Sequence, residues 1–202
     1  MLEQDTSGSE VWEAESLLLE QGKPYVVEAP SGRGKTSLLS VIYGIRTDYQ
    51  GLVYLDDRDL SSFSSKEWSK IRKNKLSFIF QGLELFDELT AMENIQLKNR
   101  ITAYHSDERI MEMARLLGID PYLQRKAGIL SFGQQQRVAI IRALCQPFNF
   151  LLADECFSHM DRENSLTAYK LIREECKARE AGLILTSLNE TGLPNIDHSL
   201  KL

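Results

Sequence analysis

Apolar positions along this chain form short continuous runs that alternate with segments of helical spacing. The runs predict strands at 25–27, 51–55, 75–80, 148–153 and 183–186, with a last edge strand at 198–202. Apolar residues three or four apart predict helices at 37–43, within 90–118, at 131–143 and at 165–179. Strands that alternate with helices predict an α/β layered fold with a mostly parallel central sheet. Ligands of such sheets bind beyond the carboxyl ends of the strands.

The length of 202 residues fits one domain, with room for an inserted subdomain. No run approaches the roughly 20 apolar residues needed to cross a bilayer. Residues 1–5 lack the basic and apolar regions of a signal peptide. These features predict a cytoplasmic protein that reaches a membrane only through a partner.

Charge and metal-ligand residues exclude further classes of function. The formal net charge is −5, and its acidic and basic residues are interspersed, so no basic stripe indicates nucleic acid as a main ligand. The candidate metal ligands are scattered along the chain: Cys145, Cys156, Cys176, His105, His159 and His198. We therefore expect reduced thiols and no metal cluster built from protein ligands.

A near match to the phosphate-binding pattern G-x-x-x-x-G-K-[ST] lies between the first predicted strand and the first predicted helix. It consists of Ala29, Pro30, Ser31, Gly32, Arg33, Gly34, Lys35 and Thr36, and Ser37 follows it. Backbone amides and the helix N-terminus in such a loop surround a nucleotide's phosphates. Lys35 can reach the terminal phosphates, and the Thr36 hydroxyl can bind Mg²⁺. The alternative is a glycine-rich turn that precedes a helix by chance.

The first position of this loop departs from the pattern, because Ala29 replaces a glycine. Alanine is strained wherever the backbone needs a positive φ, so we expect a steric penalty there if the loop requires that conformation.

Two further segments have the composition of functional sites. The apolar run 148–153 leads directly into Asp154 and Glu155, as a buried strand ending in two carboxylates would; the alternative is a solvated turn. Ser131 precedes a helical pattern and Gln134 follows three residues later, which predicts an N-cap with a capping box.

Five segments in a fixed order resemble the ATP-binding cassette (ABC) ATPases over nearly the whole chain. They are the phosphate loop, Gln81 after a strand, 130–136, 151–155 and 158–161. In that family they correspond to the Walker A loop, the Q-loop glutamine, the LSGGQ signature, the Walker B strand and the D-loop, usually written SALD. The stretch 80–95 looks most like the lipoprotein-release, macrolide-export and cell-division branch.

The resemblance implies a role for each matching residue. Asp154 would hold Mg²⁺ together with Thr36 and Gln81, and Gln81 would also sense the γ-phosphate of ATP. Glu155 would act as the general base toward the attacking water, with Lys35 on the phosphates. Ser131 and Gly133 would serve the ATP held by a second cassette, although Ser131 can also simply cap its helix. Gln134 and Asp161 would be further nucleotide-binding residues.

The resemblance further implies an architecture and partners. Residues 1–202 would form one nucleotide-binding domain with a P-loop NTPase core (1–81 and 147–202), an antiparallel β portion and an inserted helical subdomain (82–146). Two cassettes would close around two ATP molecules, at the inner face of the cell membrane. An integral membrane permease would dock a coupling helix beside the Q-loop; Leu85 and Phe86 there fit a docking surface or an ordinary core equally well.

The chain departs from the family pattern at three further points. Phe132 replaces a signature glycine, and Ser187 stands where the switch histidine is expected. No aromatic residue upstream of the phosphate loop aligns with the one that stacks on adenine, and Trp12 fits a core or edge position better.

These departures leave two main hypotheses. The first is a working ATPase subunit that drives a membrane partner, favoured by Lys35, Thr36, Gln81 and the two carboxylates. The second is a nucleotide-binding regulatory module with little or no hydrolysis. A cassette acting in translation or repair would predict a tandem second cassette or long coiled-coil insertions, and neither is visible.

Overall fold

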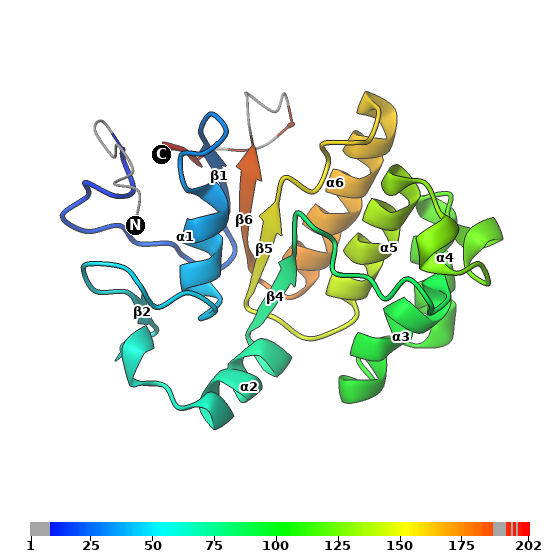
Figure 1. Ribbon diagram of the computed structural model, residues 1–202, viewed down its shortest axis with the longest axis horizontal. Coiled ribbons are helices and arrows are strands. Elements are labelled where there is room, and N and C mark those ends of the chain that lie inside the picture. The colour runs from blue at the N-terminus through cyan, green and yellow to red at the C-terminus, as the bar shows by residue number, and fades with distance from the viewer. Residues whose placement is uncertain (1–8, 188–192, 195, 197) are drawn as a thin grey trace.

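A parallel sheet of five strands forms the centre of the molecule, in the order β4-β5-β6-β1-β7 (Figure 1). The computed structural model describes residues 9–187, 193–194, 196 and 198–202. The strands are β1 (Pro24–Glu28), β4 (Leu76–Ile79), β5 (Phe150–Asp154), β6 (Gly182–Ser187) and β7 (His198–Lys201). Each neighbouring pair is parallel, and β7 lies at the edge beside β1. The predicted α/β class and the predicted edge strand are confirmed.

Helices cover both faces of this sheet, which explains why its strands are continuous apolar runs. Tyr25 and Val27 of β1 pack in one core cluster with residues of α1 (Lys35–Ile42) and of α2 (Ser65–Asn74). Val26, between them, packs in the other cluster with residues of α5 (Phe132–Leu144) and α6 (Arg162–Ala178). This alternation follows from side chains pointing to opposite faces along a strand.

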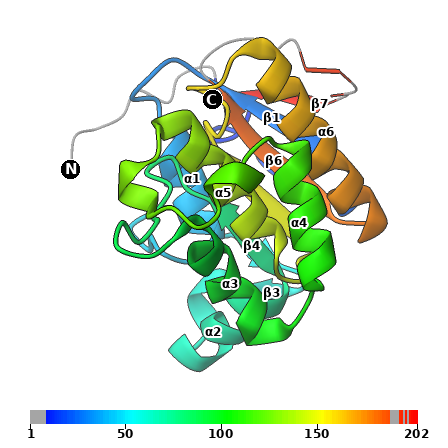
Figure 2. The ribbon, with the colours of Figure 1, turned by 90° about the vertical axis from the view of Figure 1, so that its right-hand side faces the viewer.

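The helical segment, residues 91–129, lies beyond α5 and α6 to one side of the sheet (Figure 1), and this side faces the viewer in Figure 2. The stretch predicted as helical at 90–118 contains two helices, α3 (Ala91–Thr102) and α4 (Asp107–Leu116). Ala103, at a φ of 48°, ends α3, and the Ser106 side chain caps α4. Short 3₁₀ turns at Asp120–Tyr122 and Ala127–Ile129 lead from α4 to α5.

A small antiparallel pair is the part of the fold that differs most from the sequence prediction. The strand predicted at 51–55 was too long: β2 covers only Tyr54–Leu55 and pairs with β3 (Arg58–Asp59). Gly51 has a φ of 98°, which does not continue a strand. A 3₁₀ turn at Leu60–Ser62 and helix α2 follow, and neither was predicted.

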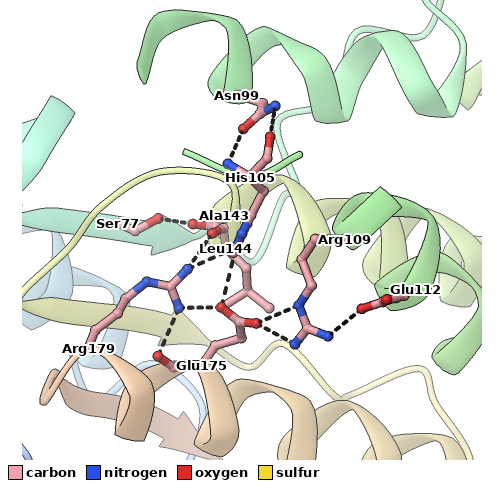
Figure 3. A network of polar contacts seen from close by, with 9 residues as sticks. All are labelled: Ser77, Asn99, His105, Arg109, Glu112, Ala143, Leu144, Glu175 and Arg179. Carbon is pink, nitrogen blue, oxygen red and sulfur yellow. Dashed lines mark hydrogen bonds and ion pairs between the residues drawn. The ribbon is translucent and has the colours of Figure 1, made fainter. Parts of the chain in front are cut away.

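A buried carboxylate joins the helical segment to the core (Figure 3). Glu175 of α6 accepts from Arg109 of α4 at 2.7 Å, and its carboxylate lies 2.5 Å from Arg179 and 3.3 Å from His105. Arg179 also donates to the carbonyl of Leu144 at 3.0 Å. These contacts fix α4 and the loop before it against α6 and the end of α5.

Other predictions concern the core and the membrane. Trp12 packs against the cluster that contains Tyr25, as predicted for a core or edge residue. The three cysteines are buried free thiols, and burial raises the pKa of Cys145 and Cys176 to about 12. Among the described residues, no helix is long and apolar enough to cross a membrane. Residues 1–5 lie outside the described residues.

Candidate functional site

The phosphate loop connects the carboxyl end of β1 to the first turn of α1. Its positive φ angles belong to Gly32 (82°) and Gly34 (95°), and Gly34 is the N-cap of α1. A side chain would be strained at both positions, whereas a glycine adopts them freely. The loop therefore presents its backbone at a helix N-terminus, where anions bind.

Ala29 lies outside the positive-φ residues, so the steric penalty that a positive φ would impose on an alanine does not arise here. It is buried, and its amide donates to the carbonyl of Ser187 at 3.3 Å. An alanine methyl group thus fits where the pattern has a glycine.

Lys35 places its ammonium group at the centre of the site. The residue is 5% exposed. Its Nζ donates to the carbonyls of Ala29 at 2.6 Å and Pro30 at 3.2 Å, and it lies 3.2 Å from Oε1 of Glu155. A buried cation held by carbonyl groups and one carboxylate is well placed to exchange these partners for phosphate oxygens.

Asp154, at the end of β5, links the phosphate loop to the neighbouring strand. Its Oδ2 accepts from the hydroxyl of Thr36 at 2.7 Å, and its Oδ1 accepts from the hydroxyl of Thr186 at 2.6 Å. The residue is 1% exposed, so both bonds stabilise a buried carboxylate. The parallel register places Thr186 of β6 beside Asp154.

Thr186 is a site residue that the sequence prediction missed as such. Its hydroxyl donates to Asp154 and accepts from the amide of Glu155 at 3.1 Å. It was predicted only as the end of a strand. Two parallel apolar runs that end in polar residues are a signal that could have found it, once the strands are known to be neighbours.

Glu155 faces the interior of the site from a strained backbone position, at a φ of 46°. Its Oε1 lies near Nζ of Lys35, and its Oε2 accepts a hydrogen bond from the side-chain amide of Gln81 at 3.3 Å. Gln81 follows the carboxyl end of β4, so side chains from three strands and the phosphate loop meet at one edge of the sheet.

The residues present fit a nucleotide with Mg²⁺. Thr36 and Asp154 offer adjacent hard oxygen atoms, the ligand type that Mg²⁺ prefers, and the glycine loop offers backbone amides to phosphates. In the part of the chain that the structure describes, no three His, Cys, Asp or Glu side chains gather as metal ligands. Such a site takes one or two protein ligands and completes the shell with phosphate and water.

The signature segment, residues 130–136, is separate from this edge of the sheet. Ser131 caps α5 with the predicted capping box: its Oγ accepts from the amide of Gln134 at 3.4 Å, and its own amide donates to Oε1 of Gln134 at 2.9 Å. Asp161 caps α6 through the amide of Asn164 at 2.8 Å, and hydrogen bonds from Asn164 lower the pKa of Asp161. Helices α1 and α5 lie on opposite sides of the sheet (Figure 1).

The segment 158–161 touches the signature directly. A Cβ added to Gly133 would lie 2.9 Å from the carbonyl oxygen of His159, which is too close for any other residue. Ser131, Gly133, Gln134 and Asp161 thus belong to a second cluster, at the starts of α5 and α6. One chain alone does not bring this cluster to its own phosphate loop.

Comparison with known proteins agrees with this geometry. Residues 13–158 match the family profile described as ABC transporter. The chain is 28% identical over 200 residues to the lipoprotein-releasing system ATP-binding protein LolD of Legionella pneumophila (strain Lens), over 98% of this chain and 88% of the relative. It is 32% identical over 179 residues to LolD 1 of Chlorobium chlorochromatii (strain CaD3), over 87% of this chain and 73% of the relative.

Solved structures of one cassette have a similar fold. The dimeric structure of the bacterial ABC transporter cassette MJ0796 matches with a TM-score of 0.74 and 29% identity, over 84% of this chain and 77% of that one. Its dimeric post-hydrolysis state, bound to ADP and Pi, matches with a TM-score of 0.77 and 28% identity, over 86% and 78%. Since the profile covers more than half of its length and the fold agrees, this chain belongs to the ABC transporter family.

Proposed function

We propose that this chain binds and hydrolyses ATP at the edge formed by β1, β4, β5 and β6, and that two copies close around two ATP molecules to drive a membrane partner. The observation that carries this proposal is the convergence of Lys35, Thr36, Gln81, Asp154 and Glu155. The chain is the ATP-binding ATPase subunit of an ABC transporter.

Each residue of this edge has a defined task in the proposal. The backbone of 29–34 and the ammonium of Lys35 bind the phosphates, and Ser37 follows in the first turn of α1. Thr36, Asp154 and Gln81 would hold Mg²⁺, and the bound ion would neutralise charge on the phosphate oxygens. Thr36 and Asp154 are already joined at 2.7 Å, so their oxygen atoms need little rearrangement.

Glu155 acts as the general base in this proposal. Its carboxylate contacts Lys35 through one oxygen and Gln81 through the other, so both groups can orient it toward the attacking water. The hydrogen bond from the backbone amide of Glu155 to the Thr186 hydroxyl holds the strained backbone, which directs the Glu155 side chain into the site.

The second cluster serves the ATP of the other subunit. Ser131, Gly133, Gln134 and Asp161 lie at the starts of two helices, where amides and side chains can meet phosphate oxygens from another chain. The dimeric cassettes similar to this chain support that arrangement.

The surface beside Gln81 is the proposed docking site for an integral membrane permease, which would hold the chain at the inner face of the cell membrane. Phe86 is 59% exposed, so its reading as a core residue was wrong, whereas Leu85 packs against the core. Leu97 and Ile101 of α3 are also exposed large apolar residues. Because the relatives include ATP-binding proteins of lipoprotein-releasing systems, we propose a partner of that type.

Hydrolysis is favoured over a purely regulatory role. The regulatory hypothesis rested on Ala29, Phe132 and Ser187, and the strain expected at Ala29 does not arise. Ser187 contacts the phosphate loop through its carbonyl, a contact that does not depend on which side chain it carries. A similar cassette is bound to ADP and Pi.

Steady-state phosphate release tests the proposal, with Glu155→Gln as the inactive variant and Glu163→Gln, an exposed acid of α6, as the matched control. We expect Glu155→Gln to lose at least 100-fold of the rate, in line with the loss of a general base. Equal rates in wild type and Glu155→Gln, with the membrane partner present, would contradict hydrolysis at this site.

A further inference from the structure

Two aromatic rings join the signature segment to the segment between β5 and α6. The ring of Phe132 meets the ring of His159 edge to face, with centroids 4.4 Å apart and an interplanar angle of 62°. Phe132 is the first residue of α5, and His159 precedes the Asp161 cap of α6. The family pattern has a glycine at the first of these positions and an alanine at the second, so both departures occur in one contact.

Further contacts bring the two segments together around these rings. The backbone at Gly133 lies against the carbonyl of His159, leaving no room for a Cβ. The buried Gln136 donates from Nε2 to the hydroxyl of Ser158 at 3.3 Å, and that hydroxyl lies 2.9 Å from Nδ1 of His159. The His159 ring is therefore held from its own segment by Ser158 and from the signature helix by Phe132.

A second connection exists at the other end of the helical segment. There the Glu175 carboxylate holds Arg109 of α4 against α6 (Figure 3). The carboxyl-terminal part of α6 is thus fixed to α4, and the segment just before α6 is held against the start of α5. The signature segment and the segment 158–161 therefore present one surface. This is the surface that faces a second cassette in the proposed function.

We propose that Phe132 and His159 are a matched pair of positioning residues, which set the signature segment against the segment 158–161 and thereby the geometry in which two cassettes close around ATP. This proposal rests on the proposed function. Phe132 is 41% exposed, so its ring is available both to His159 and to a facing surface. A glycine and an alanine at these two positions could not form this ring contact.

The contact itself is measured in the single chain without nucleotide. Edge-to-face contact shifts the imidazole proton resonances of His159 through the ring current of Phe132. We expect Phe132→Leu to abolish this shift, Phe132→Tyr to retain it and Leu116→Ala, a change at an exposed residue of α4, to leave it unchanged. Resonances of His159 that are the same in wild type and Phe132→Leu would overturn the proposal.

The role in closure is measured by light scattering with Mg-ATP, in a Glu155→Gln background, which we expect to retain bound ATP because it lacks the proposed general base. We expect Phe132→Leu and His159→Ala each to raise the ATP concentration for half-maximal dimerisation by about 2- to 12-fold, the usual range for an aromatic pair. The double variants Phe132→Leu/His159→Ala and Phe132→Gly/His159→Ala should be no worse than the worse single variant. His159→Phe, which keeps a ring, should restore dimerisation relative to His159→Ala.

The outcomes separate this proposal from the proposed function. If the Glu155→Gln parent does not dimerise with ATP, the proposed closure fails and the positioning role fails with it. If the parent dimerises but the two single effects multiply in the double variant, the pair is not coupled and only the positioning role is overturned.

Discussion

The hydroxyl of Thr186 donates to Oδ1 of Asp154 over 2.6 Å, from one parallel strand to its neighbour. The same hydroxyl accepts a hydrogen bond from the backbone amide of Glu155, so one side chain positions both carboxylate residues of the site. This relationship connects the end of β6 to the chemistry at the end of β5.

Thr186→Val should therefore impair both stability and turnover. It removes the hydrogen bonds that Thr186 makes to Oδ1 of the buried Asp154 and to the backbone amide of Glu155, although Oδ2 of Asp154 keeps its bond from Thr36. This loss costs about 1–3 kcal/mol of unfolding free energy. We expect the rate of phosphate release to fall about tenfold or more. Thr186→Ser, which retains the hydroxyl, is the matched control. A Thr186→Val protein as stable and as active as Thr186→Ser would contradict this role.

Lys35→Met should weaken nucleotide binding. It removes the buried cation at the centre of the loop and its contact with the Glu155 carboxylate, which keeps its hydrogen bond from Gln81. A hydrogen bond to a charged group contributes about 1.5–3 kcal/mol, so we expect a loss of about 10- to 150-fold in ATP affinity. Fluorescent-nucleotide titration measures this, with the exposed Lys170→Met as control. Similar affinities for the two variants would refute the assignment.

Gly133→Ala should destabilise the chain. The new Cβ would lie 2.9 Å from the carbonyl oxygen of His159, and backbone must move to relieve the overlap. Overpacking of this kind costs about 1–3 kcal/mol. Thermal unfolding should show a lower Tm for Gly133→Ala than for Gly82→Ala, whose Cβ would meet only the flexible end of Glu84. The reverse order of Tm values is the result that would count against the contact.

Glu175 should contribute to stability in a pH-dependent way. Burial by itself would raise the pKa of this carboxyl, but hydrogen bonds from His105 and Arg109 and the charge of Arg179 lower it to about 2. A folded-state pKa below the ordinary value of 4.5 stabilises the folded chain above pH 4.5. That contribution is lost as the pH falls from 4.5 toward about 2.

Urea unfolding at several pH values measures the effect, with Glu175→Gln as the test and the exposed Glu174→Gln as the control. We expect Glu175→Gln to lose about 3 kcal/mol at neutral pH, because it leaves buried cations without their carboxylate. The difference from wild type should shrink at acid pH. A difference that stays constant from pH 7 to pH 3 would exclude ionisation of Glu175 as its cause.

Much of the site could be predicted because it is encoded locally. The glycines and the lysine of the phosphate loop, and the carboxylates that follow β5, are neighbours along the chain. The capping box of Ser131 and Gln134 requires only a spacing of three residues, and the structure has it. Patterns of this length reflect backbone conformation, which neighbouring side chains determine.

Other elements escaped prediction because their local signals are weak or are overridden. Helix α2 is mostly polar and buries only Ile71, so apolar spacing did not reveal it, although Ser64 and Glu67 form a capping box there. The strand predicted at 51–55 was too long, and its first residue, Gly51, has a positive φ, which an apolar pattern does not report. The division into a core at 1–81 and 147–202 and a subdomain at 82–146 stays a prediction.

The sequence by itself determined the phosphate loop, the paired carboxylates, the helix caps and the alternation of strands and helices, because each depends on residues a few positions apart. Only the tertiary structure decided which of them meet. Thr36 contacts Asp154 across 118 positions of the chain, and Gln81 contacts Glu155 across 74. The order of the parallel strands places Thr186 beside Asp154, and the packing of α5 on α6 places Phe132 against His159. Such contacts depend on strand order and on helix packing over the whole sheet, which no short stretch of sequence specifies.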